Sequence, residues 1–261
     1  MRATRVAFFC GENKAMPATA ILSALAEEQR GLIELLQRPK KVSHAGRDFW
    51  LGDLHGQSVV LALSKIGKVA AATTAAALIE RWGVQRVVFT GVAGGLGHNV
   101  NVGDIVVAHD FVQHDLDVSP LFARYEVPLY GKTRFDGDAM LTAALFEASQ
   151  LALNNNQLRS IYPAARVHRG LIASGDRFVS GVNESSQLRH ALLAAGHDVL
   201  AVEMEGAAVA QVCHDYNVPF AAARTISDRA GDTAHVDFPN FIDQVASKYA
   251  QIIIERLLKL L

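Results

Sequence analysis

The segment Ala201–Asp228 constrains the fold more than any other part of the chain, because it reads as strand, helix and strand in succession. Ala201–Glu205 is a short strand or a strand end, and Gly206–Tyr216 carries its apolar residues at helical spacing. Val218–Thr225 is a second strand, apolar enough to be buried. A unit of this kind predicts a sheet with helices packed against it.

Three carboxylates, Glu203, Glu205 and Asp228, stand at the edges of these apolar segments. Burying a carboxylate costs several kcal/mol unless hydrogen bonds or a ligand satisfy it, so the positions favour an active site. Asp228 follows Ser227 just past the expected carboxyl end of a strand, where open α/β sheets bind ligands. Glu203 and Glu205 have an alternative interpretation, as acids stabilised by the dipole of the following helix.

The rest of the chain continues the alternation, which predicts a mixed or mostly parallel sheet. Strands are expected at Arg5–Cys10, Phe49–Leu54, Val59–Leu63, Arg86–Thr90, Asp104–Ala108 and Val167–Ala173. Helices are expected at Pro17–Leu36, Lys68–Trp82, Ala139–Leu151 and Phe238–Leu260. The irregular segment Phe111–Gly137 suggests a functional or interfacial loop. Because no linker or repeat interrupts the pattern, we expect a single domain over residues 1–261.

Composition and charge exclude several classes of function. Of the 261 residues, 50% are hydrophobic and 20% are charged, as in soluble enzymes with a large core. The formal net charge of −1 gives no electrostatic basis for binding nucleic acid or an anionic membrane, and Arg38–Lys41 is interpreted as a solvated loop. With Cys10 and Cys213 as its two cysteines and no apolar leader or spanning segment, the chain is expected to be cytoplasmic.

Two further motifs follow expected strands. Thr90–Leu96 reads TGVAGGL, and its glycines let the backbone around Val92, Ala93 and Gly94 approach a ligand closely. It matches neither the dinucleotide fingerprint nor a P-loop, and the alternative is a tight turn between strands.

The second motif is Ser174–Val179, which reads SGDRFV. Phe178 could stack on a flat ligand while the backbone of Val179 reads the ligand's edge. The alternative is an ordinary loop with Phe178 packed into the core.

No metal or other cofactor is expected. His114, Asp115 and Asp117 lie close together, but the sequence offers no further ligands at a metal-binding spacing. A Ser-His-Asp triad is not supported either, because the chain has no G-x-S-x-G motif.

Taken in order, the motifs resemble the nucleoside phosphorylase/hydrolase superfamily, and among its members most of all the 5'-methylthioadenosine/S-adenosylhomocysteine nucleosidases. The resemblance rests on TGVAGGL with NVGDIVV, SGDRFVSG, AVEMEGAAVAQVCHDYNVPF, RTISDRAGD and SKIGKVAAA. It implies a three-layer α/β/α sandwich with a central mixed, partly closed sheet. It also implies hydrolysis of the N-glycosidic bond of an adenine nucleoside, without cofactor or metal. His114–Val118 is similar to the family's dimer-side segment, so the resemblance implies a homodimer.

The resemblance also implies roles for residues around the sugar and at N7 of the base. Asp228 would protonate or hydrogen-bond N7 of adenine, and Ser227 would hold Asp228. Glu205 would accept the ribose 2'- and 3'-hydroxyls, and Met204 would pack beneath the sugar. Arg224 would lie near the ribose and the attacking water.

At the base, Phe178 would stack on the purine and the backbone of Val179 would read its edge. The glycine loop, with Val92, Ala93 and Gly94, completes the expected binding residues. Glu203 stays open between a contact to the substrate and a structural role.

The chain departs from the nucleosidase pattern on the side of the nucleophile. In that family the first strand leads into a loop resembling Ala-Met-Glu-Glu-Glu, whose last glutamate activates water. The stretch matched to it here is Ala15–Thr19, so Thr19 stands at the position of the base, and a hydroxyl is a poor proton acceptor at neutral pH. Glu12 is a substitute candidate, and Val92 replaces a common serine.

Two rival functions stay open at this point. Related phosphorylases clamp phosphate with an arginine before the glycine loop and a serine inside it, whereas Phe89 and Val92 stand at those positions here. Phosphorolysis is therefore less favoured than hydrolysis. A nucleoside-binding protein with weakened catalysis is the third hypothesis, motivated by Thr19 at the position of the glutamate.

Overall fold

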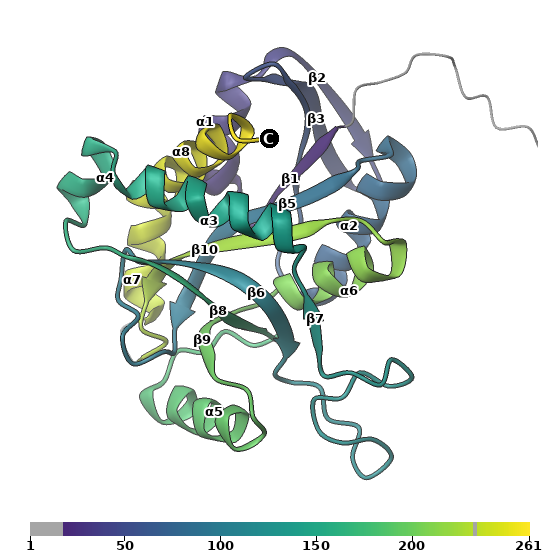
Figure 1. Ribbon diagram of the computed structural model, residues 1–261, viewed down its shortest axis with the longest axis vertical. Helices are drawn as coiled ribbons and strands as arrows, with labels where there is room; N and C mark the ends of the chain where they lie inside the picture. Colours follow the sequence, from purple (N-terminus) through teal and green to yellow (C-terminus); the bar gives the residue numbers. More distant parts are fainter. Residues whose placement is uncertain (1–17, 232–233) are drawn as a thin grey trace, which may run out of the picture.

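The computed structural model describes residues 18–231 and 234–261 (Figure 1). The strand expected at Arg5–Cys10 and the candidate base Glu12 lie outside the described residues.

Ten strands of the described part form one sheet. They are β1 (Thr19–Ser23), β2 (Gln37–His44), β3 (Arg47–Leu54), β4 (Gln57–Leu63), β5 (Arg86–Gly95), β6 (Ile105–Gln113), β7 (Arg134–Asp136), β8 (Val167–Ser174), β9 (Val199–Glu203) and β10 (Phe220–Asp228). Their order is β10-β6-β8-β9-β5-β1-β4-β3-β2, with β7 paired to β6. Because β10 also pairs with β5, five strands close into a ring, while β1 to β4 extend from it.

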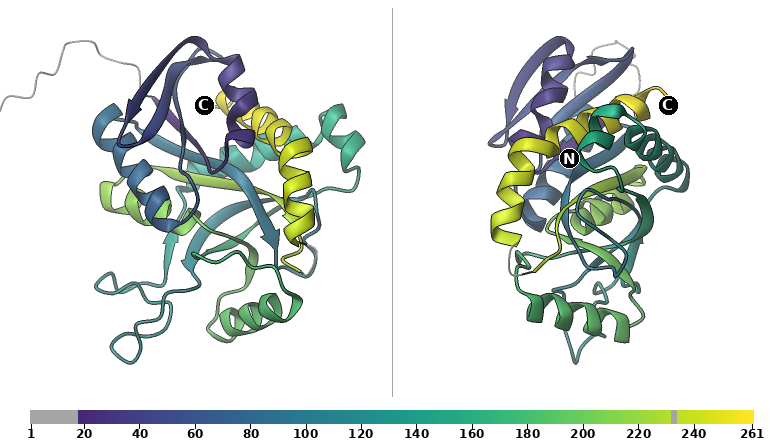
Figure 2. Two further views of the ribbon diagram at one scale, coloured as in Figure 1. Left: turned by 180° about the vertical axis from the view of Figure 1, so that it is seen from behind. Right: turned by 90° about the vertical axis from the view of Figure 1, so that its left-hand side faces the viewer.

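The helices are α1 (Ala26–Leu35), α2 (Lys68–Trp82), α3 (Ala139–Leu153), α4 (Asn156–Ile161), α5 (Val182–Ala194), α6 (Gly206–Tyr216), α7 (Ala234–Phe241) and α8 (Ser247–Leu258), with a π-helical segment at Ile242–Ala246. Helices α2 and α6 pack together on one side of the sheet, and α1, α3 and α8 pack on the other (Figures 1 and 2).

Each face of the sheet has its own hydrophobic core, because side chains alternate along a strand. In β5, Val87 and Phe89 join the core that includes α2 and α6, whereas Val88 joins the core that includes α1, α3 and α8. The sheet is mixed, since β10 runs parallel to β5 and antiparallel to β6. The predicted three-layer α/β/α fold with a mixed, partly closed sheet is confirmed.

Two sequence-based assignments are wrong. The helix expected over Pro17–Leu36 begins only at Ala26, because Thr19–Ser23 is the strand β1, buried between β4 and β5. An apolar run that is buried on both faces carries no alternation to distinguish a strand from a helix. Arg38–Lys41, expected as a loop, lies in the mostly exposed edge strand β2, where charged side chains discourage pairing with another sheet.

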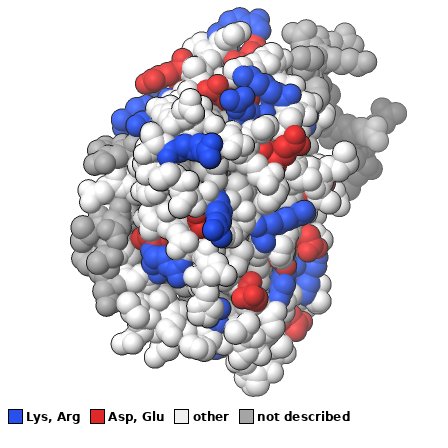
Figure 3. All heavy atoms as spheres, turned by 60° about the vertical axis from the view of Figure 1, so that its left-hand side comes forward, with Lys and Arg blue, Asp and Glu red and all other residues white. Residues whose placement is uncertain are grey.

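The remaining surface fits the near-zero net charge. On the face shown in Figure 3, basic and acidic side chains are interspersed rather than gathered into one field. Within the described residues, none of the helices combines the length and the apolar character that a membrane crossing requires.

The strand register brings the sequence motifs to one edge of the sheet. Gly94 in β5 is paired with Asp228 in β10, and Ser174 in β8 is paired with Glu203 in β9. Strand β9 also pairs with β5, through Gly94 and Val202. The glycine loop, the SGDRFV segment and the three carboxylates therefore meet at the ends of neighbouring strands, as expected for a site in an α/β sheet.

Candidate active site

A cavity of about 360 Å³ opens at this edge of the sheet. Most residues that the sequence singles out line it, namely Val92, Ala93, Gly94, Phe178, Val179, Glu203, Met204, Glu205, Arg224, Ser227 and Asp228. The lining also includes residues that the sequence analysis did not select, among them Glu28, Ile66, Arg177 and Phe238.

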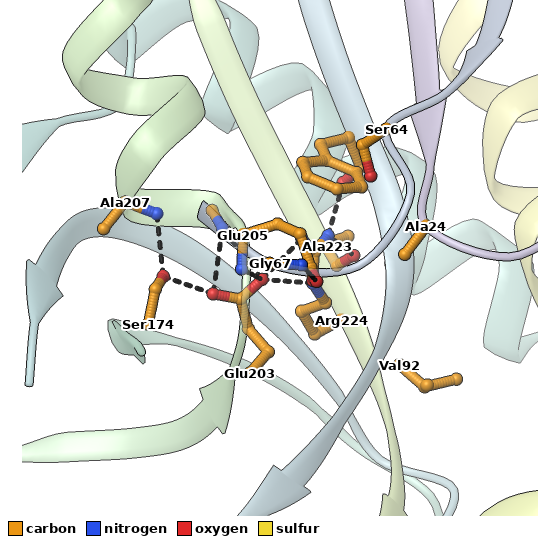
Figure 4. Close-up of polar contacts among 12 residues, drawn as sticks. Ala24, Ser64, Gly67, Val92, Ser174, Glu203, Glu205, Ala207, Ala223 and Arg224 are labelled. Atoms are coloured by element: carbon orange, nitrogen blue, oxygen red, sulfur yellow. Dashed lines mark hydrogen bonds and ion pairs between the residues drawn. The ribbon is translucent and has the colours of Figure 1, made fainter. Parts of the chain in front are cut away.

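Glu203 is held by donors from four residues (Figure 4). Ser174 Oγ donates to Oε1, and the backbone N–H of Gly206 lies 2.9 Å from each carboxylate oxygen. Glu205 N donates to Oε2 at 3.2 Å, and Arg224 Nη2 donates to Oε2 at 2.8 Å. A carboxylate offers about four lone-pair positions, so Glu203 has little capacity left for a substrate.

Arg224 contacts both Glu203 and Phe89, and all three residues line the cavity. Its side chain is only 2% exposed, and its guanidinium lies over the Phe89 ring, with 4.0 Å from Cζ to the ring centroid. Nη1 donates to the Phe89 carbonyl at 3.1 Å. A buried cation needs such partners, because removing one leaves an uncompensated charge. These contacts favour the structural alternative for Glu203: its carboxylate neutralises Arg224 and accepts hydrogen bonds from the first N–H groups of α6.

Glu205 is also buried but has few partners. Its Oε1 accepts one hydrogen bond, from Gly67 N at 2.8 Å, and its Oε2 has no hydrogen-bond partner within the described part of the chain. Burial, reinforced by the nearby negative charge of Glu203, raises the pKa of Glu205 to about 8. One carboxyl oxygen thus remains available to a ligand.

Asp228 lies at the end of β10 with both oxygens oriented by neighbours. Ser227 Oγ donates to Oδ2 at 2.8 Å, and Ala230 N donates to Oδ1 at 2.7 Å. A Cβ on Gly94 would lie 3.1 Å from Asp228 Oδ1, so the glycine allows the two strands to approach here. Thr90–Leu96 is thus not a simple turn, since Arg86–Gly95 is one strand whose end lines the cavity.

Phe178 faces the cavity rather than the core. Its side chain is 46% exposed and meets Phe238 of α7 edge to face, with 5.6 Å between ring centroids. The alternative that places Phe178 in the core is therefore wrong. An exposed ring beside a cavity can stack on a flat ligand.

Glu28 is the residue that sequence reasoning missed. It is 1% exposed, accepts hydrogen bonds from Ala24 N (2.8 Å) and Leu25 N (3.0 Å) at Oε2, and from Val92 N (3.1 Å) at Oε1. Burial raises its pKa, although these hydrogen bonds and the charge of Arg224 act in the opposite direction.

The structure also corrects the placement of Thr19. Thr19 is the first residue of β1, where it is paired with Val59 and Arg86, and it does not line the cavity. The segment that follows β1 reads Ala-Leu-Ala-Glu-Glu and ends at Glu28. This string is the signal in the sequence for Glu28, but it falls in the middle of the helix expected over Pro17–Leu36.

In the segment His114–Asp117, Asp115 is bound by other parts of the protein. Asp115 accepts hydrogen bonds from Lys68 Nζ at 2.6 Å and from Asp176 N at 2.8 Å. Among the described residues, no cluster of three or more His, Cys, Asp or Glu side chains could hold a metal ion.

Comparisons with known proteins give consistent matches. The family model described as the phosphorylase superfamily matches residues 18–259. The chain is 38% identical over 236 residues to a 5'-methylthioadenosine/S-adenosylhomocysteine nucleosidase of Bacillus thuringiensis (strain Al Hakam), which covers 90% of this chain and 96% of the relative.

Solved structures agree. The Neisseria meningitidis 5'-methylthioadenosine/S-adenosylhomocysteine nucleosidase in complex with methylthio-immucillin-A superposes with a TM-score of 0.82 at 36% identity, covering 94% of this chain and all of that one. The native futalosine hydrolase of Helicobacter pylori superposes with a TM-score of 0.81 at 31% identity, covering 94% and 99%.

Proposed function

The chain belongs to the phosphorylase superfamily, and from this premise we propose that it hydrolyses the N-glycosidic bond of adenine nucleosides, releasing adenine. Substrates of the proposed class are 5'-methylthioadenosine and S-adenosylhomocysteine, which the relatives' names carry. The observation that carries the proposal is the presence of Glu28 in one cavity with Glu205 and Asp228, each in different surroundings.

In the proposed mechanism Glu28 is the base that activates water. Its carboxylate accepts three backbone hydrogen bonds, which leaves about one lone-pair position for a water molecule. Because burial raises its pKa, Glu28 accepts a proton more readily than an exposed glutamate does.

Glu205 and Asp228 would act on the two parts of the substrate. The free oxygen of Glu205 would bind the ribose hydroxyls above Met204, and Asp228 would donate or share a proton at N7 of adenine. Protonation of the base improves the leaving group, and a held sugar favours the oxocarbenium-like transition state of glycoside cleavage. Phe178 and the backbone of Val179 would hold the purine.

Hydrolysis is favoured over phosphorolysis by the charges of the cavity. Four carboxylates line it, and of the two lining cations within the described residues Arg224 is buried against Glu203 and Arg177 is paired with Glu184. Neither Phe89 nor Val92 offers a side-chain donor to phosphate. With Glu28 as the proposed base, the hypothesis of a binding protein without catalysis is less favoured, since it depended on a missing base.

We further propose one domain over the whole chain, assembled as a cytoplasmic homodimer. The family match across 18–259 supports the single domain, and the likeness of His114–Val118 to the family's dimer-side segment supports the homodimer. The buried free thiol of Cys213 is consistent with a reducing compartment.

The function is tested by incubating the protein with 5'-methylthioadenosine, S-adenosylhomocysteine, adenosine and inosine, each with and without phosphate. We expect adenine release that does not depend on phosphate, and loss of that release in Asp228→Asn. Strict dependence on phosphate would overturn the proposal in favour of phosphorolysis, and tight binding without turnover would favour a binding protein.

A further inference from the structure

The turn before α2 carries the backbone donor to Glu205. Gly67 N donates to Glu205 Oε1 at 2.8 Å, and within the described residues this is the hydrogen bond that orients the buried carboxyl group (Figure 4). The direction of the free oxygen of Glu205 therefore depends on where Gly67 lies.

This turn lacks a helix cap of its own. Gly67 is the N-cap residue of α2, and a glycine has no side chain that could accept a hydrogen bond from the first N–H groups of the helix. Lys65 has a φ of +62° and Gly67 a φ of +96°, and a lysine adopts such a backbone only where contacts hold it there. The turn therefore needs acceptors from elsewhere in the chain.

Asp176 supplies the missing cap from a distant segment. It lies just after β8, and its Oδ1 accepts a hydrogen bond from Lys68 N at 2.7 Å. A Cβ on Gly67 would lie 3.1 Å from the same oxygen, so the carboxylate packs directly against the turn. The helix dipole favours a negative charge at this end of α2. The first N–H groups at this end, those of Gly67 and Lys68, thus donate to the carboxyl groups of Glu205 and Asp176.

Further contacts hold Asp176 in place. Asp115 Oδ2 accepts a hydrogen bond from Asp176 N at 2.8 Å, and Asp115 Oδ1 accepts one from Lys68 Nζ at 2.6 Å. Lys68 Nζ also donates to Gln113 Oε1 at 3.0 Å. The capping residue and the helix it caps are therefore joined a second time, through Asp115. Asp176 does not line the cavity itself, so its effect on a substrate would pass through residues that do.

We propose that Asp176 is a positioning residue for Glu205: it fixes the Gly67 turn and thereby directs the free carboxyl oxygen of Glu205 towards the sugar hydroxyls. Asp176 has only to accept a hydrogen bond from Lys68 N, so an amide oxygen at the same position should serve as well. The inference rests on the proposed function, in which Glu205 binds the ribose hydroxyls.

The first test measures the preference of the enzyme for the sugar hydroxyls. It compares kcat/KM for adenosine with kcat/KM for 2',3'-dideoxyadenosine, which lacks both hydroxyls. Loss of a helix cap corresponds to a change of roughly two- to thirty-fold, so we expect Asp176→Ala to lower the ratio of the two values by that factor. Asp176→Asn keeps an acceptor oxygen and should restore the ratio. An unchanged ratio in Asp176→Ala would overturn the proposal, and so would an equal loss for both nucleosides.

The matched control is Asp138→Ala, which removes a carboxylate cap from a different helix. Asp138 Oδ1 accepts a hydrogen bond from Leu141 N at 2.8 Å at the start of α3, and none of the residues of α3, all of which are described, lines the cavity. We expect this variant to lose about as much stability in urea as Asp176→Ala while its ratio stays unchanged. An equal fall of the ratio in both variants would reduce the effect to general stability and overturn the proposal.

A double-mutant cycle tests whether the effect passes through Glu205. Calorimetry in the Glu28→Gln background gives affinities for adenosine and for 2',3'-dideoxyadenosine without turnover. We expect Asp176→Ala to weaken the binding of adenosine relative to that of the dideoxy analogue, and to have no such effect once Glu205→Ala is present. An effect that persists in Glu205→Ala would overturn the role of Asp176. If the unmodified protein releases adenine from no nucleoside, the proposed function fails, while these affinities still decide whether Asp176 positions Glu205.

Discussion

Glu203 and Glu205 are two residues apart, equally buried and very different in their surroundings. Glu203 is 7% exposed and Glu205 is 5% exposed. Glu203 accepts hydrogen bonds from four residues, including a buried arginine, whereas Glu205 accepts one from a backbone N–H. Burial alone therefore does not separate the two carboxylates. Unused hydrogen-bonding capacity does, and it favours Glu205 as the ligand-binding group, since a buried group without partners is costly unless a ligand supplies them.

Glu28 is intermediate between Glu203 and Glu205, because its carboxylate accepts three backbone hydrogen bonds and has no bound cation. The largest expected effect tests the proposal that Glu28 is the base. Glu28→Gln removes the proposed base while nearly preserving shape, so we expect kcat to fall by about 10²- to 10⁴-fold. Steady-state adenine release measures the change, with circular dichroism to confirm folding. Turnover close to that of the unmodified protein would show that another group activates the water.

The second prediction compares how substitution of Glu203 and of Glu205 changes the stability of the protein. Glu203→Gln leaves Arg224 buried without a countercharge, which should lower the free energy of unfolding by about 3–5 kcal/mol. Glu205→Gln is the matched control, because it replaces an equally buried carboxyl group that has no cation bound to it and that holds its proton below about pH 8. We expect that variant to lose activity without a comparable loss of stability in urea unfolding. Greater destabilisation by Glu205→Gln would contradict the division of roles.

The sequence predicts some parts of this site well. Gly206–Tyr216 and Lys68–Trp82 are helices with the predicted bounds, because each has an amphipathic pattern and an adjoining glycine or turn. Asp228 and Phe178 come together as expected, since both follow strands whose ends meet at one edge of the sheet.

Other parts depend on contacts that no local pattern records. Glu28 was missed because its place in the cavity follows from the position of β1, and the apolar run Thr19–Ser23 fits a helix as well as a strand. The role of Glu203 depends on Ser174 and Arg224, which reach it from two other strands. Such long-range pairing is decided by the register of the sheet.

The smallest expected effect is a pH dependence that separates Glu205 from Glu203. The pKa of Glu205 is raised to about 8 from an ordinary value of 4.5, so the folded protein binds the extra proton between these limits. The free energy of unfolding should therefore fall as pH rises towards 8, by no more than about 1.4 kcal/mol per pH unit. Burial lowers the pKa of His114 and His197, which has the opposite effect on stability, but mainly below the ordinary histidine value of 6.5.

Urea unfolding between pH 7 and pH 8 therefore isolates the contribution of the raised carboxyl groups. The slope should flatten in Glu205→Gln, because that side chain can no longer release a proton. It should persist in Lys41→Met, which removes an ion pair with Asp48 and a contact with the Trp50 ring, both on the β2–β3 hairpin and away from Glu205. If the slope survives in Glu205→Gln, the proton is held elsewhere; Glu28, whose pKa is raised in the same direction, is then the group to replace next.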